Sequence, residues 1–334
     1  MKRVLSTVLA LAIVFGTTAY TSAAAAPSDA LQMRIQGDAV MVSAGELHTV
    51  GLRADGTVVA TRVYYLSDTS RQHEIDRGQS EVCDWRDIIA VSAGVLHTVG
   101  LRADGTVVAT RVTDAQADFG QSDVEGWRDI AAISTGGHYT IGLRLDGTVV
   151  HTGLDENNKW RDISGWRDIV AISASGQIAG GLQSDGTVVV TSGHYPDLVS
   201  QSDVAGWRNI VAVSAGEYHF AGLKADGTVL VAGSNQSGQL DVANWRDIVA
   251  VSTGAWHTIG LKADGTVVIA GEVNGDGSVH FGDVNGWKDI VAISTGGMHV
   301  VGLKADGTVV MAGDTTNGQG SASSWHSIRV PYRW

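Results

Sequence analysis

Residues 42–61 read "VSAGELHTVGLRADGTVVAT", and residues 91–110 repeat this stretch with one change, Glu46 against Val95. Weaker copies follow at intervals of about 42 residues. The seven copies start at Val42, Val91, Ile133, Ile172, Val213, Val251 and Ile293. Self-similarity at this period is typical of folds built by stacking one small supersecondary unit, so the chain is expected to contain seven such units.

Each repeat predicts three short strands. The β-branched run "DIVAVS" indicates a strand buried on both faces, and "HTVGLR" and "TVVAT" indicate a second and a third. The second and third are joined by "ADGT", in which Asp-Gly predicts a type I′ hairpin turn with positive φ at both residues. A variable stretch then leads to a Trp, usually in "WRDI". It is expected to form a fourth outer strand or an extended crossing.

Seven units of antiparallel strands, each with a crossing to the next unit, predict an all-β, seven-bladed β-propeller of about 42-residue repeats. We call the end that the first strand of each blade reaches the top face. The alternative is a β-solenoid, although solenoid coils are usually shorter and lack a hairpin in each unit. "GDAVMVSAG" near the start lacks a preceding Trp, and "SSWHSIRVPYRW" at the end supplies one. Residues 37–334 are therefore expected to close as a ring through N- and C-terminal strands.

Residues 1–25 have the pattern of a cleavable signal peptide. Lys2 and Arg3 precede an uncharged run over residues 4–20, and small residues extend to Ala25. The alternative, an uncleaved membrane anchor, is disfavoured because 17 residues are short for a span of roughly 20. A short lead, residues 26–36, would precede the propeller. The pattern predicts a secreted or cell-surface protein without membrane insertion.

The composition excludes some partners. A formal net charge of −12 disfavours nucleic acid and anionic membrane surfaces, which bind through Lys and Arg. Cys83 is the single cysteine, so no intramolecular disulfide can form; its role is left open. We expect a monomer.

The repeat pattern S-A-G-x-x-H-x-x-x-L-x-x-D-G-x-V-x-x-x-G resembles the regulator of chromosome condensation repeat family. "SNQSGQL" at residues 234–240, after Gly233, matches that family's Gly-x-Asn-x-x-Gly-Gln-Leu signature. The short period is more similar to compact bacterial secreted members, which include propeller-type β-lactamase inhibitor proteins. The resemblance covers residues 37–330 and implies a propeller. It also implies an extracellular enzyme as one class of partner, without specifying which.

Residues that recur in the repeats are expected to serve the scaffold. The recurring histidines, at most one per blade, are too far apart on a ring to share a zinc ion, which needs nitrogens at about 2.0–2.1 Å. They are His48, His97, His219, His257 and His299. The tryptophans are expected to pack, and the Arg-Asp pairs of "WRDI" to form modest ion pairs. Residues 274–283 lack a full calcium-loop spacing. No catalytic residue, metal or cofactor is predicted.

Positions that vary between repeats are candidates for function. The two residues between "SAG" and "H" fall on top-face turns near the axis, and several are large and apolar. Such a ring is typical of a binding patch, although these side chains could instead fold inward and plug the channel. The candidate binding residues are Leu47, Leu96, His138, Tyr139, Tyr218, Trp256 and Met298. Aromatics in the inserts at 64–68 and 194–197 are expected to reach the same face.

The sequence thus favours a secreted, non-enzymatic propeller that binds a protein partner on its top face, with inhibition of an extracellular enzyme among its candidate roles. The main alternative is a carbohydrate-binding or lyase-type propeller that uses His138, Glu46 and Glu217 in the central pit. A cell-surface structural protein is a third hypothesis.

Overall fold

The computed structural model describes residues 41–65, 73–74, 76–153, 162–191, 198–271, 282–314 and 317–331. The predicted signal peptide and lead lie outside these ranges. So do residues 66–68 and 194–197 of the inserts and most of the calcium-like segment.

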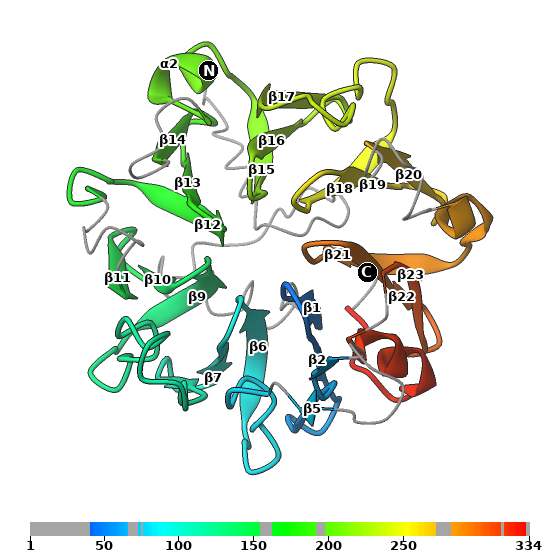
Figure 1. Ribbon diagram of the computed structural model, residues 1–334. Helices are drawn as coiled ribbons and strands as arrows, with labels where there is room; N and C mark the ends of the chain where they lie inside the picture. The colour runs from blue at the N-terminus through cyan, green and yellow to red at the C-terminus, as the bar shows by residue number, and fades with distance from the viewer. Residues whose placement is uncertain are drawn as a thin grey trace, which may run out of the picture.

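Seven antiparallel sheets surround a common axis, which confirms the seven-bladed all-β propeller (Figure 1). The innermost strands are β1 (Val42–Ala44), β6 (Ile88–Ala93), β9 (Ile130–Thr135), β12 (Ile169–Ser175), β15 (Ile210–Ala215), β18 (Ile248–Thr253) and β21 (Ile290–Thr295). The middle strands are β2 (Thr49–Leu52), β7 (Thr98–Arg102), β10 (Tyr139–Arg144), β13 (Ile178–Gln183), β16 (His219–Lys224), β19 (Thr258–Lys262) and β22 (His299–Lys304). The outer strands are β3 (Val58–Ala60), β8 (Val107–Ala109), β11 (Val149–Gly153), β14 (Val188–Thr191), β17 (Val229–Gly233), β20 (Val267–Ala270) and β23 (Val309–Gly313).

The variable stretches connect one blade to the next. Within the described residues every blade sheet has three strands, so the return to the next blade is an irregular crossing and no fourth blade strand forms. The connections also contain the strand pair β4 (Tyr64–Tyr65) and β5 (His73–Glu74), the helical turn α2 (Gln201–Val204), and the 3₁₀ turns η1 (Gly282–Gly286) and η2 (Gln319–Ser324).

The hairpin between the second and third strands forms as expected, but its predicted turn type is wrong. Only the glycine of each "ADGT" has positive φ, for example 78° at Gly56. Gly56 N–H donates to Arg53 O (3.0 Å) and Arg53 N–H donates to Thr57 O (2.9 Å), which is a type I turn followed by a glycine bulge. The Asp55 carboxylate accepts from Thr57 N–H (2.9 Å) and Oγ1–H (2.6 Å) and so stabilises the type I turn with its glycine bulge.

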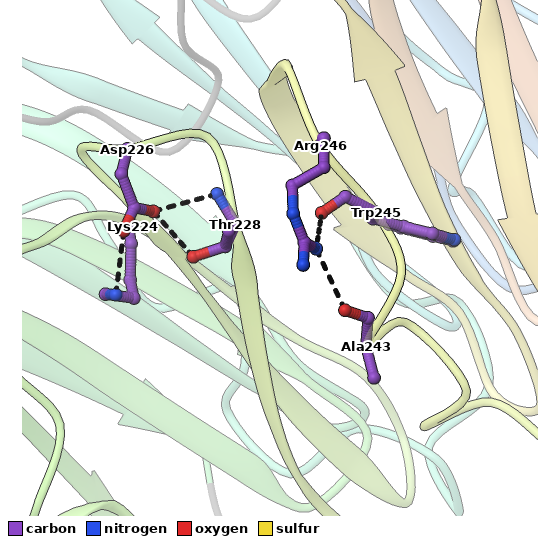
Figure 2. A network of polar contacts seen from close by, with 6 residues as sticks. All are labelled: Lys224, Asp226, Thr228, Ala243, Trp245 and Arg246. Atoms are coloured by element: carbon purple, nitrogen blue, oxygen red, sulfur yellow. Dashed lines mark hydrogen bonds and ion pairs between the residues drawn. The ribbon is translucent and has the colours of Figure 1, made fainter.

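Figure 2 shows the same turn in the fifth blade, where the Asp226 carboxylate binds Thr228 and the Lys224 ammonium group (2.9 Å). The Arg–Asp ion pairs expected from "WRDI" do not form among the described residues. The Arg246 guanidinium donates to Ala243 O (2.9 Å) and Trp245 O (2.6 Å), and so caps the turn before the inner strand. Arg86, Arg128, Arg167 and Arg208 do the same in other blades.

Each recurring tryptophan packs on a glycine of the middle strand in its blade. A Cβ on Gly100 would lie 2.8 Å from Trp85 Cζ3, so only glycine leaves room for the indole. In the first blade, Trp325 from the C-terminal segment occupies the equivalent place over Gly51. The packing role predicted for these tryptophans is therefore confirmed at both sites.

The blades are joined near the axis by a closed ring of serine hydrogen bonds. The "SAG" serine of each blade accepts a backbone N–H from the inner strand of the next blade, and all seven contacts are described. Ser43 accepts from Ala93 (2.9 Å), and Ser294 of the last blade accepts from Ala44 of the first (2.9 Å). The other serines are Ser92, Ser134, Ser173, Ser214 and Ser252. The ring thus closes between the two ends of the chain.

The recurring histidines join blades too, as their expected scaffold role requires. His48 is fully buried, and its Nε2 lies 2.9 Å from Thr98 Oγ1 of the next blade. Because Thr98 Oγ1–H donates to Gln79 O (2.8 Å), the imidazole must carry its proton on Nε2. His97, His219 and His299 make the equivalent contact at 2.8–3.1 Å. These four side chains therefore each bond to a threonine of the next blade.

The junction between the fourth and fifth blades replaces this polar contact with an apolar one. Ile178 occupies the histidine position and Phe220 the threonine position, and both are fully buried. A Cβ on Gly180 would lie 2.2 Å from the Phe220 ring, so glycine there makes space for the phenyl group. Repeat four is thus a specialised blade whose sheet keeps the pairing of the others.

Acid should weaken the histidine junctions. Burial lowers the pKa of His48 and His299 to about 4, and that of His97, His219 and His257 to about 3, from 6.5. The unfolded chain therefore binds more protons, and the free energy of unfolding should fall as pH drops from about 6.5 towards 4. Urea midpoints measured at fixed steps between pH 8 and 4 should be flat above pH 7 and decline below it. A midpoint unchanged down to pH 4.5 would contradict neutral, buried histidines.

Candidate functional site

The inner strands and top-face turns of all seven blades enclose a cavity of about 550 Å³ on the propeller axis. Its wall consists of the "SAG" segments, so the same serines that join the blades surround its lower part. Leu198, at the end of the repeat-four insert, also lines it. The chain therefore places a concave site where the most variable positions of the repeats converge.

The two variable residues of each turn take different places. The first faces the cavity in every blade: Glu46, Val95, Gly137, Gly176, Glu217, Ala255 and Gly297. Of the second residues, only His138, Gln177 and Tyr218 line the cavity. Leu47, Leu96, Trp256 and Met298 are on the same turns but outside the lining, and we call these four residues together with Tyr218 the rim. The prediction grouped both residues of each turn, whereas the structure separates those that line the cavity from those outside the lining.

The rim contains an aromatic pair and an exposed methionine. The Tyr218 and Trp256 rings, from adjacent turns, lie 4.3 Å apart between centroids with a tilt of 34°. Met298 is 40% exposed and is the one large hydrophobic residue exposed to this extent in the described part of the chain. Leu47 and Leu96 are half-buried. Large apolar side chains that remain accessible around a pocket mouth are typical of protein-binding surfaces.

Tyr139 is placed differently from the other candidates. It is buried, and its hydroxyl donates to Ile178 O of the next blade (2.6 Å). Tyr139 thus takes the inter-blade position that histidine has in other repeats, and we do not include it in the proposed binding surface. His138 precedes it, is half-buried at the cavity, and has its ring 4.9 Å from that of Phe119.

Two carboxylates give the cavity its charge. Partial burial by the surrounding turns, and secondarily the charge of Glu217, raise the pKa of Glu46, although solvent still reaches its side chain through the mouth. Burial, followed by polar interaction with the Glu217 carboxylate, raises the pKa of Tyr218 as well. A tyrosine, with an ordinary pKa of about 10, adds no charge at neutral pH, and Glu46 and Glu217 are the acidic residues of the lining.

The structure brings together Glu46, Glu217 and His138, the residues of the alternative central-pit hypothesis, because all three line the cavity. No group of three or more His, Cys, Asp or Glu residues is placed to hold a metal ion in the described ranges. Cys83 is exposed and unpaired. No helix among the residues that the structure places is long and apolar enough to cross a membrane.

Gln177 and Leu198 were missed by the prediction from sequence. Gln177 is in the turn of repeat four, where Ile178 replaces the histidine found in five of the other six turns. Leu198 follows an insert whose path no repeat pattern fixes. The signal that could have found Gln177 was its equivalence to Leu47 and Trp256.

Comparison with known proteins supports the repeat family and the fold. Residues 210–239 match the model of the regulator of chromosome condensation (RCC1) repeat. No curated protein matches the sequence. The CRINKLY WD40 ectodomain of the Arabidopsis thaliana receptor kinase ACR4 is 18% identical, with a TM-score of 0.61 over 82% of this chain and 94% of that chain.

Yeast RCC1 (Prp20) is also similar in structure. In its complex with Kap60 it is 13% identical, with a TM-score of 0.56 over 95% of this chain and 89% of that chain. Saccharomyces cerevisiae Prp20p, whose binding to Gsp1p and histones was studied, is 15% identical, with a TM-score of 0.53 over 89% of this chain and 86% of that chain. The matched segment spans the fifth blade, and the other six blades repeat its pattern. The chain is a seven-bladed β-propeller, and one of its seven blades matches the RCC1 repeat model.

Proposed function

We propose that this protein is a secreted, non-enzymatic binding module whose top face holds a protein partner. The observation that carries the proposal is the rim of Trp256, Tyr218 and Met298 around an open axial cavity. The aromatic pair supplies a rigid apolar anchor, and the cavity can receive a side chain of the partner. An extracellular enzyme is the partner class that the family resemblance supports, which would make the protein an inhibitor or accessory subunit.

The structural neighbours are consistent with a protein-interaction module. Yeast RCC1 (Prp20) was crystallised with Kap60, and binding of Prp20p to Gsp1p and histones has been examined. The ACR4 neighbour is a receptor ectodomain. These partners are not transferred to this chain, since the similarity is one of fold; what supports binding here is the surface itself.

Replacing Trp256 should strongly weaken partner capture. The immobilised protein would be exposed to secreted proteins of its source organism and neighbouring species, and a stoichiometric protein should be retained. Trp256→Ala should weaken that complex by about 30-fold or more, as loss of a central aromatic anchor does. The affinity would be measured by calorimetry with the purified partner.

Two further variants separate binding from folding. Asn244→Ala changes an exposed residue at the opposite end of the same blade and should leave the affinity unchanged. Met298→Asp places a charge on the rim without touching the core and should also weaken the complex. Retention of no protein, or of polysaccharide equally by wild type and Trp256→Ala, would overturn the proposal and favour the carbohydrate alternative.

A further inference from the structure

The axial cavity contains two carboxylates that no cation of the described chain neutralises. Glu46 and Glu217 both line it, and neither forms an ion pair among the described residues. None of the residues that line the cavity is Lys or Arg. The two groups lie close enough for the charge of Glu217 to act on Glu46. Their charges therefore repel each other in the unbound protein, and a cation inside the cavity would be attracted by both.

The cavity also offers an aromatic face next to the carboxylates. Tyr218 lines the cavity beside Glu217 and is held by its contact with Trp256, with 4.3 Å between ring centroids. An ammonium or guanidinium group over such a ring gains a cation–π attraction. The volume of about 550 Å³ lies within the range of sites that enclose small ligands, and it is ample for one long side chain.

We propose that the protein partner inserts one lysine or arginine side chain into the axial cavity, where Glu46 and Glu217 bind its cation and Tyr218 contacts it. This inference rests on the proposed binding function and specifies its anchor. A side chain of a protein fits better than a free amine because the cavity opens within the apolar rim of Leu47, Trp256 and Met298. That rim would contact the residues that flank the inserted side chain.

A selection of short peptides tests the inference before the natural partner is identified. Libraries of disulfide-constrained random peptides would be selected on the immobilised protein at neutral pH, and each selected peptide would be assayed against wild type and Trp256→Ala. Peptides whose binding requires Trp256 should share one Lys or Arg position. Replacing that residue by norleucine should weaken binding by at least about tenfold.

Variants that remove the charge of each glutamate test whether the selected Lys or Arg binds in the cavity. Glu46→Gln and Glu217→Gln should each weaken binding of the selected peptide that carries Lys or Arg. The double variant should bind that peptide and its norleucine form equally. Glu125→Gln removes an exposed carboxylate before the third inner strand and serves as the matched control, with no effect expected. Thermal unfolding of each variant would verify that the fold is retained.

The outcomes separate the anchor from the general function. Peptides that require Trp256 but show no conserved cation, or that bind the double variant as tightly as wild type, would overturn the cationic anchor and leave top-face binding intact. Peptides that bind Trp256→Ala and wild type equally would overturn both.

Discussion

Gly296→Ala is expected to leave little or no folded protein. An added Cβ would lie 2.1 Å from Gly45 O of the first blade and 2.4 Å from His299 Cε1. Neither neighbour can move freely. Gly45 follows Ala44, whose N–H donates to Ser294, and its own N–H donates to His48 O (2.8 Å), while His299 Nε2 lies 3.1 Å from Thr49 Oγ1. Overpacking of this kind costs about 3 kcal/mol or more, since the junction of the last and first blades must open. Urea unfolding should show a much lower midpoint, if soluble protein is obtained at all.

Gly126→Ala is the matched control for this substitution. No atom lies within 4 Å of an added Cβ at Gly126, and its φ is compatible with alanine. The change should therefore be neutral or slightly stabilising, because alanine restricts the unfolded chain. If both variants unfolded at the same urea concentration, the close backbone packing around the axis would be contradicted.

Much of the fold could be predicted because one unit recurs with the same marks in every copy. The Trp before each inner strand and the Asp-Gly hairpin fix the direction of each strand, and the split repeat at the two ends implies closure. The turn type could not be read from Asp-Gly alone, since that dipeptide suits two hairpins. The Thr57 hydroxyl, which binds Asp55, decides between them.

The contacts between blades were less accessible from the sequence. The His48 partner, Thr98, is one residue past the histidine position but one blade further on, so the pairing depends on the direction in which the ring closes. Ile178 replaces the histidine in the fourth blade, and Phe220 replaces the threonine in the fifth, so these two exchanges also indicate which residues meet between blades. They can be recognised as a pair only when the direction of ring closure is known.

The candidate site was predicted by position but not by orientation. Sequence alone placed both turn residues on the top face, whereas the turn conformation sends Glu217 into the cavity and Trp256 to the rim. Tyr139 was grouped with the binding candidates for its size. Its alignment with the histidine position was the better guide, since a side chain there packs between blades.

A chain that ends at Ser324 is expected to lose cooperative folding. The removed segment supplies Trp325, which packs over Gly51, and Ile328, which is buried and bridges to Arg53. Arg329 N–H also donates to Leu52 O (2.9 Å). Burying Trp and Ile contributes about 1.5–3 kcal/mol each, before the cost of the void they leave. That sum is a large part of the roughly 5–15 kcal/mol by which a domain is stable.

The truncation should lower the free energy of unfolding by more than the lost burial alone, because it also opens the ring at the first blade. In the other blades the inner strand is continuous, with an irregularity such as that between Ile88 and Ala90. In the first blade the chain ends meet at this irregularity, with Ile328 in the place of Ile88. Removal of the segment frees backbone groups of β2, and such edges promote association. Urea unfolding and light scattering should show a lower midpoint and larger particles.

His326→Ala in the full-length chain is the control for this region, because His326 is exposed and should tolerate the change. A synthetic peptide of residues 325–331, added to the truncated protein, should restore part of the urea midpoint by re-forming the first blade in trans. A truncated protein that unfolds at the full-length midpoint and stays monomeric would mean that the serine and histidine contacts between the last and first blades hold the ring closed by themselves.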